Sequence, residues 1–178
     1  MTEARPSTTI RRATLDDAAP LAQLAERTFR DAFDDVNTPA DMALHCETSY
    51  GEAIQSAEIA DPDRVTLVCE QDARLLGYAQ LRWGPAPGSV VANNPGEIQR
   101  LYVERECHGK GVAVDLMKAS IEEMRRRRVD VIWLGVWELN PRAIAFYRKF
   151  GFVPVGEHVF QLGSDPQRDI VMARPTEA

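Results

Sequence analysis

The fold is decided by the stretch Glu97-Ile98-Gln99-Arg100-Leu101-Tyr102-Val103, which continues through His108-Gly109-Lys110-Gly111-Val112-Ala113 into a segment with an apolar stripe. The first part has the pattern of a strand, the glycines indicate a loop, and the apolar stripe has helical spacing. Glycine lacks a Cβ, so the backbone N–H groups of such a loop can approach a ligand closely. The helix start adds unpaired N–H groups and the positive end of the helix dipole. This order of elements predicts a site for a phosphate or pyrophosphate group held mainly by backbone.

Outward from this stretch, the sequence predicts a mixed α/β fold. Strands are expected at 10–13, 65–69, 75–83, 97–103, 131–136, 153–162 and 168–172. Helices are expected from about residue 14 or 17, from 39 to 60 with a break near 49–51, after the glycine loop, and from 140 to 151. The resulting order, β-α-α-β-β-β-α-β-α-β-β, implies a mixed sheet flanked by helices, with the ligand site near its middle.

Several helix ends carry local signals. Thr38-Pro39 and Asn140-Pro141 each combine a capping side chain with proline at the first helical position. Gly151 suits the residue just past a helix end, where a left-handed conformation is common. Pro20 favours the later start for the first helix, because proline is tolerated in a first turn but not deeper in a helix.

Length and composition narrow the class of protein. The 178 residues suit one domain, which we expect over 10–174 after a flexible segment, 1–9. The three cysteines lack close spacing, which argues against a disulfide framework or a metal site and suits a reducing cytoplasm. No apolar run is long enough to span a membrane, and the first residues lack the apolar core of a secretory signal. The net charge of −6 weighs against nucleic acid as a partner and is compatible with a cationic small substrate. We therefore expect a cytoplasmic protein without a metal, membrane or nucleic-acid partner.

Two segments resemble the GNAT superfamily of acetyl-CoA-dependent N-acetyltransferases. His108-x-x-Gly111-x-Ala113 is similar to its Gln/Arg-x-x-Gly-x-Gly/Ala loop, although His108 stands where Gln or Arg is usual. The run 140–152, Asn-Pro-Arg-Ala-Ile-Ala-Phe-Tyr-Arg-Lys-Phe-Gly-Phe, is similar to its Asn-x-x-Ala-x-x-Phe-Tyr-x-x-x-Gly-Phe motif. The resemblance extends over residues 10–173 and implies the GNAT fold, a central, mostly antiparallel mixed sheet of about seven strands flanked by helices.

A narrower likeness concerns the acceptor. The segments 28–33, 133–138 and 158–163, together with Asp169-Ile170-Val171-Met172, are similar to the PaiA-type spermidine/spermine N-acetyltransferases. This likeness suggests a polyamine acceptor.

The superfamily resemblance implies acetyl-CoA as acetyl donor and an amine as acceptor, with direct transfer in a ternary complex. The pantetheine arm is expected along the strand at 101–103, and the pyrophosphate at the glycine loop. Asn140 is expected to cap its helix and to contact the cofactor. The expected cofactor-binding residues are Leu101, Tyr102, Val103, His108, Gly109, Lys110, Gly111, Val112, Ala113, Asn140 and Tyr147.

Two residues are candidates for proton transfer. An amine must be neutral to attack a thioester, so a base is useful, and Glu97 stands where many GNAT members carry a catalytic glutamate. It is equally a solvated residue at a strand end. Tyr147 matches the general acid that protonates the leaving thiolate, although a helical tyrosine is more often a packing residue.

The acceptor site is less well defined. Phe29, Phe33, Tyr78 and Trp83 supply either aromatic walls for the acceptor or core packing, and His158 lines the pocket or is a structural residue. The alternative acceptors are a protein N-terminal or lysyl amine and an amine-bearing antibiotic. A regulatory protein that senses acetyl-CoA or binds DNA is the alternative of another class, and homodimers are common in folds of this kind.

Overall fold

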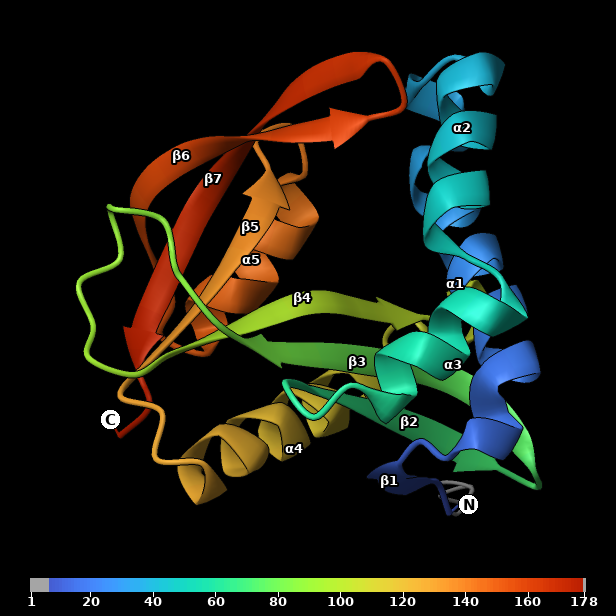
Figure 1. The fold of residues 1–178 in the computed structure, drawn as a ribbon, viewed down its shortest axis with the longest axis horizontal. Helices are drawn as coiled ribbons and strands as arrows, with labels where there is room; N and C mark the ends of the chain where they lie inside the picture. Colours follow the sequence, from blue (N-terminus) through green and yellow to red (C-terminus); the bar gives the residue numbers. More distant parts are fainter. Residues whose placement is uncertain (1–6, 178) are drawn as a thin grey trace, which may run out of the picture.

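The computed structural model describes residues 7–177. In this part of the chain the strands are β1 (Thr9–Arg12), β2 (Arg64–Gln71), β3 (Arg74–Trp83), β4 (Pro95–Val103), β5 (Val131–Trp137), β6 (Val153–Leu162) and β7 (Asp165–Pro175). The α-helices are α1 (Ala18–Phe33), α2 (Pro39–Ser49), α3 (Glu52–Ala60), α4 (Val112–Arg126) and α5 (Pro141–Lys149). The strands form one sheet in the order β1-β2-β3-β4-β5-β7-β6, in which only the β4–β5 pair is parallel (Figure 1). The predicted mixed sheet flanked by helices is confirmed.

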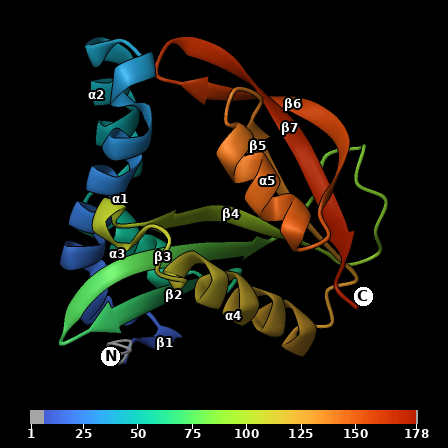
Figure 2. The same ribbon diagram turned by 180° about the vertical axis from the view of Figure 1, so that it is seen from behind.

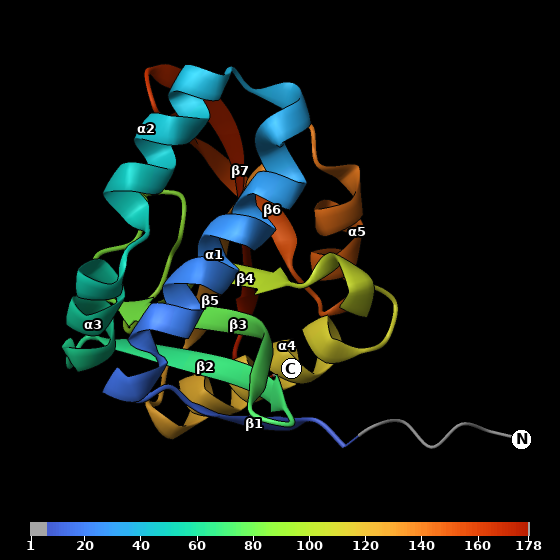
Figure 3. The ribbon, with the colours of Figure 1, turned by 90° about the vertical axis from the view of Figure 1, so that its right-hand side faces the viewer.

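The helices cover the two faces of the sheet. Helices α1, α2 and α3 lie on one face, and α4 and α5 lie on the other (Figures 2 and 3). Leu21, Leu24 and Phe29 on the apolar face of α1 pack into one core cluster with Val68 and Tyr78 of the sheet. The side chains of α4 pack into a second cluster, with β2 to β5. Apolar burial on both faces explains why β2, β3 and β5 are nearly continuous runs of buried residues.

The predicted helix ends are also confirmed. Thr38 Oγ1 accepts a hydrogen bond from Asp41 N at 3.2 Å, and Asn140 Oδ1 accepts one from Ala143 N at 3.1 Å. Helix α1 begins after a short 3₁₀ turn, so Pro20 lies in its first turn. Gly151 takes the left-handed conformation, with φ +84°, and ends α5.

The parallel pair β4–β5 is short and determines where the site lies. It comprises three residue pairs, from Pro95↔Val131 to Glu97↔Trp133, and beyond them the two strands diverge (Figure 1). A Cβ on Gly96 would lie 2.5 Å from Met124 Sδ, so the glycine allows α4 to pack closely against this junction. The diverging strands leave their backbone edges open to a ligand.

Over residues 7–177, none of the helices combines the length and the apolar character that crossing a membrane requires.

Candidate active site

A groove of about 690 Å³ opens where β4 and β5 diverge. It lies between the end of β4, the start of α4 and the exposed side of α5. Seven of the residues predicted for the cofactor line this groove: Leu101, Tyr102, Val103, His108, Ala113, Asn140 and Tyr147. The structure therefore brings together the predicted strand, loop and helix residues from two distant parts of the chain.

The loop between β4 and α4 depends on glycine. Gly109 and Gly111 have φ values of +75° and +87°, which other residues adopt only with strain. The first bond of α4 runs from Asp115 N to Gly111 O at 3.0 Å. The N–H groups of Val112 and Ala113 come before this bond, so they lie at the positive end of the helix and remain available to an anion.

His108 has a local role in this loop. Its Nε2 lies 3.1 Å from the carbonyl oxygen of Val103, so the imidazole joins the loop to the end of β4. The amides of His108 and Lys110 donate to the carbonyls of Arg105 and Cys107, at 3.1 Å in each case. These two amides are therefore occupied by the loop itself.

Three of the four remaining predicted loop residues line a different cavity, and Gly111 lines neither. Gly109, Lys110 and Val112 line a second cavity, of about 590 Å³, which also contains Arg74 and Glu106. The predicted pyrophosphate residues are thus divided between the groove and this neighbouring cavity.

Tyr147 is half-buried and lines the groove. Desolvation raises the pKa of the phenol to about 12. The hydroxyl therefore stays protonated across the physiological range, as a proton donor must.

A further pocket, of about 310 Å³, lies between α1 and the strands β5, β6 and β7. The pocket is lined by four residues that the sequence predicts for proton transfer or for acceptor binding: Phe29, Phe33, Glu97 and His158. Its aromatic wall also includes Tyr102, Trp137 and Phe160, with the rings of Phe33 and Trp137 in edge contact at 6.1 Å. We name it the acceptor pocket.

The groove and the acceptor pocket adjoin. They share four lining residues, Phe33, Gln99, Tyr102 and Gly135. A group held in the groove would therefore meet a group held in the acceptor pocket at this junction.

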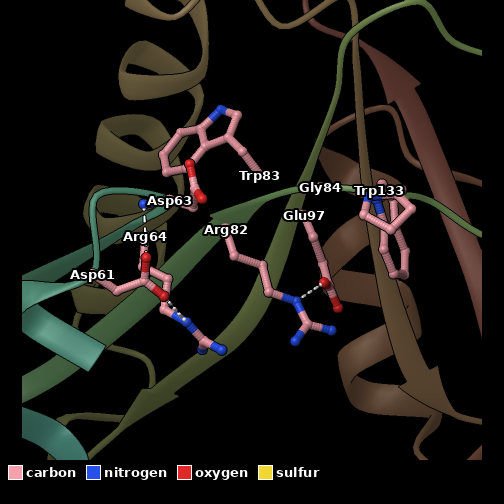
Figure 4. Close-up of a pocket in the computed structure, with 9 residues that line it drawn as sticks. Asp61, Asp63, Arg64, Arg82, Trp83, Gly84, Glu97 and Trp133 are labelled. Carbon is pink, nitrogen blue, oxygen red and sulfur yellow. Dashed lines mark hydrogen bonds and ion pairs between the residues drawn. The ribbon is translucent and has the colours of Figure 1, made fainter. Parts of the chain in front are cut away.

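Glu97 is buried and forms an ion pair with Arg82 Nε of β3 (Figure 4). Both residues also line a separate cavity, of about 400 Å³, with Trp83 and Trp133. Trp83 thus lies on the far side of this ion pair, away from Phe29 and Phe33.

Tyr78 is elsewhere. Its side chain is 1 % exposed and packs in the core below α1, at 6.1 Å from the ring of Tyr102. The structure therefore does not bring Tyr78 or Trp83 to the acceptor pocket.

Asp169 and Gly135 are among the residues of this pocket that were not predicted for it. Asp169 Oδ2 lies 3.6 Å from His158 Nε2, and burial raises the pKa of this carboxyl, while His158 partly offsets the rise. A Cβ on Gly135 would lie 2.6 Å from His158 Nε2, so the glycine leaves room for the imidazole. A carboxylate beside the apolar run Ile170-Val171-Met172 was the sequence feature that could have indicated Asp169.

Known proteins with similar sequences are N-acetyltransferases. An uncharacterised N-acetyltransferase of Lactobacillus delbrueckii subsp. lactis is 33% identical over 158 residues, covering 89% of this chain and 91% of the relative. The spermine/spermidine N(1)-acetyltransferase of Bacillus subtilis (strain 168) is 27% identical over 135 residues, covering 71% of this chain and 88% of the relative.

Solved structures share the fold. The PaiA N-acetyltransferase from Thermoplasma acidophilum, crystallised in complex with coenzyme A, superimposes with a TM-score of 0.75. It is 21% identical, and the match covers 95% of this chain and 99% of that one. The model of the acetyltransferase (GNAT) family matches residues 21–152, a span that contains the glycine loop, the diverging strands and Tyr147. With this match and the similarity over most of its length, the chain belongs to the GNAT family of acetyltransferases.

Proposed function

We propose that the protein transfers the acetyl group of acetyl-CoA to a primary amine in one step, with both substrates bound together. The observation that carries this proposal is the junction of the two cavities at Phe33, Gln99, Tyr102 and Gly135. A thioester at the end of the groove and an amine in the acceptor pocket would face each other there, so proximity alone would favour the reaction.

The groove supplies the contacts that the donor requires. The first N–H groups of α4 would bind the pyrophosphate, and the open edge of β4 at 101–103 would hold the pantetheine arm. The amide of Val103 would stabilise the negative charge that develops on the acetyl carbonyl. Coenzyme A supplies the thioester, whose sulfur is the leaving group.

Both sides of the reaction need a proton transfer. Removing a proton from a primary amine with a pKa of about 10.4 costs about 4–5 kcal/mol at neutral pH, so a base in the acceptor pocket would raise the rate. The pocket contains Glu97, which the sequence predicts for this role, and His158. Tyr147, with its raised pKa, would give its proton to the departing thiolate.

The acceptor we propose is a polyamine such as spermidine or spermine. The acceptor pocket combines the carboxylates of Glu97 and Asp169 with the rings of Phe29, Phe33 and Trp137. Carboxylates attract ammonium groups, and aromatic faces bind both cations and methylene chains. The likeness to the spermine/spermidine N(1)-acetyltransferase of Bacillus subtilis points in the same direction.

Thiol release from acetyl-CoA tests this proposal, measured with spermidine, spermine, lysine peptides and aminoglycosides. We expect saturable turnover with a polyamine and little with the other amines. Turnover with peptides or aminoglycosides alone would overturn the polyamine acceptor. The absence of turnover with every amine would overturn the proposed reaction.

A further inference from the structure

The acceptor pocket contains a second pair of ionisable groups, separate from Glu97 and Arg82. His158 of β6 and Asp169 of β7 are directly paired in the antiparallel register of the two strands. His158 Nε2 lies 3.6 Å from Asp169 Oδ2, which is an ion-pair distance once the imidazole carries a proton. The side chain of Asp169 is 11% exposed and that of His158 is 33% exposed. The carboxylate is thus buried behind an imidazole that remains accessible to a ligand.

The imidazole of His158 lies next to the junction between the groove and the acceptor pocket. Gly135 lines both the groove and the acceptor pocket. The atom closest to a Cβ built on Gly135 is His158 Nε2, at 2.6 Å. His158 Nε2 therefore lies against the junction where a thioester and an amine would meet.

Glu97 is placed differently. Its carboxylate is held by Arg82, and both residues face the cavity beyond the ion pair as well as the acceptor pocket. Like His158, it lines the acceptor pocket and not the groove. The ion pair with Arg82 occupies this carboxylate, and its negative charge can attract an ammonium group.

The surroundings of His158 contain few other charges. The charged groups that share its pocket are Asp169 of β7, Glu97 of β4 and Arg82 of β3. Helix α1 contributes the rings of Phe29 and Phe33, and β5 contributes Gly135, Trp137 and the nearby ring of Trp133. Asp169 is thus the nearest group that can stabilise an imidazolium.

We propose that His158 takes the proton from the acceptor ammonium and that Asp169 acts as its positioning residue. The inference rests on the proposed acetyl transfer. The N–H bond of the ammonium breaks, the proton moves to the imidazole of His158, and the freed lone pair attacks the thioester carbon. The C–S bond then breaks and the thiolate takes a proton from Tyr147. The acetylated nitrogen releases a second proton, which restores the Tyr147 hydroxyl, and His158 returns its proton to solvent.

The test compares His158→Gln, Asp169→Asn and Glu97→Gln in thiol-release kinetics with spermidine, or with the panel amine that the wild type acetylates fastest. Asp16→Asn is the control, because Asp16 is exposed in the short 3₁₀ turn before α1 and lines neither the groove nor the acceptor pocket. Calorimetry with coenzyme A shows whether each variant is folded and retains the groove.

We expect His158→Gln to lower kcat/KM for the amine by about 100-fold near neutral pH, with coenzyme A affinity unchanged. The difference in kcat/KM between His158→Gln and the wild type becomes smaller as the pH approaches the pKa of the acceptor, because more of the amine is then already unprotonated. It also falls below about 10-fold for trifluoroethylamine, which is uncharged at neutral pH. Asp169→Asn shows the same pH profile with a smaller deficit, whereas Glu97→Gln mainly raises KM for a cationic amine.

A His158→Gln variant with the rate and pH profile of the wild type overturns the assignment while leaving the acetyl transfer in place. A deficit of equal size at every pH and with both amines also overturns it, since it indicates a structural role. Inactivity of the wild type toward every amine in the panel overturns the proposed function and this assignment with it.

Discussion

The imidazole of His158 lies where a side chain on Gly135 would have to be, with Nε2 2.6 Å from the position of a Cβ. Asp169 Oδ2 lies 3.0 Å from the same position. Gly135, which lines both the groove and the acceptor pocket, thus packs directly against His158 and Asp169.

Replacing Gly135 by Ala should move both His158 and Asp169. Moving a reacting group by about 1 Å should lower kcat/KM for the amine by about 10- to 100-fold. The control is Gly51→Ala, whose Cβ would meet only Ile54 Cδ1, at 3.9 Å. In a double-mutant cycle, Gly135→Ala should cause little further loss when His158 is already Gln. Full additivity would contradict the coupling.

The Tyr147→Phe substitution removes the proposed proton donor but keeps the aromatic ring in the groove. We expect coenzyme A affinity to be unchanged and kcat to fall by about 100-fold. The pKa of Tyr147 is raised to about 12, so the donor remains protonated at lower pH and the wild type should lose no activity through this group as the pH rises to 10. Stopped-flow thiol release measures kcat, and equal values for the two proteins would refute the role.

Gly111→Ala tests the loop at the start of α4. With φ at +87°, an alanine at this position costs about 1–2 kcal/mol or forces the loop to rearrange. Rearrangement withdraws the helix N–H groups from the pyrophosphate, so the dissociation constant for coenzyme A should rise about 10-fold or more. Gly88→Ala is the control, since a Cβ there meets nothing within 4 Å. Equal affinities for the two variants would show that the loop does not grip the cofactor.

Stability at acid pH should depend on Arg11. Its guanidinium donates to both Asp17 oxygens, at 2.7 and 2.9 Å, and to Glu70 at 2.7 Å. The hydrogen bond to Arg11 is the main cause that lowers the pKa of Asp17 below its ordinary value of 3.8. A lowered pKa stabilises the fold above pH 3.8, and this stabilisation is lost as the pH falls through the folded-state value.

Arg11→Ala should therefore reduce the free energy of unfolding by about 1–2 kcal/mol at neutral pH. The difference from the wild type should narrow as the pH falls from 3.8 through the lower folded-state pKa of Asp17, because the unfolded state takes up the proton first. Urea unfolding at both pH values measures this, with Lys118→Ala on the exposed side of α4 as the control. A constant difference at all pH values would exclude the Asp17 interaction as its source.

Features that depend on neighbouring residues were predictable from the sequence. The caps Thr38 and Asn140, the position of Pro20 and the positive φ of Gly151 follow from backbone rules that act within a few residues. The groove at the glycine loop was predictable for the same reason, because a strand, a loop and a helix start are consecutive in the chain.

The acceptor pocket depends on contacts that sequence spacing does not encode. Asp169 reaches His158 through the register of β6 on β7, and Gly135 reaches both through the packing of β5. The aromatic residues of β3 illustrate the same limit. Tyr78 packs in the core under α1, whereas Trp83 lies at the strand end, in a cavity beyond the Arg82–Glu97 pair. Only the packing of the strands on their helices decides between these environments.

Calorimetric titration with coenzyme A is the decisive measurement, since every proposed step begins with the cofactor in the groove between β4 and β5. We expect saturable heat at one site, weakened by Gly111→Ala and retained by Tyr147→Phe and His158→Gln. The absence of heat with the folded wild type, or equal affinity for the wild type and Gly111→Ala, would show that the groove does not bind coenzyme A as proposed.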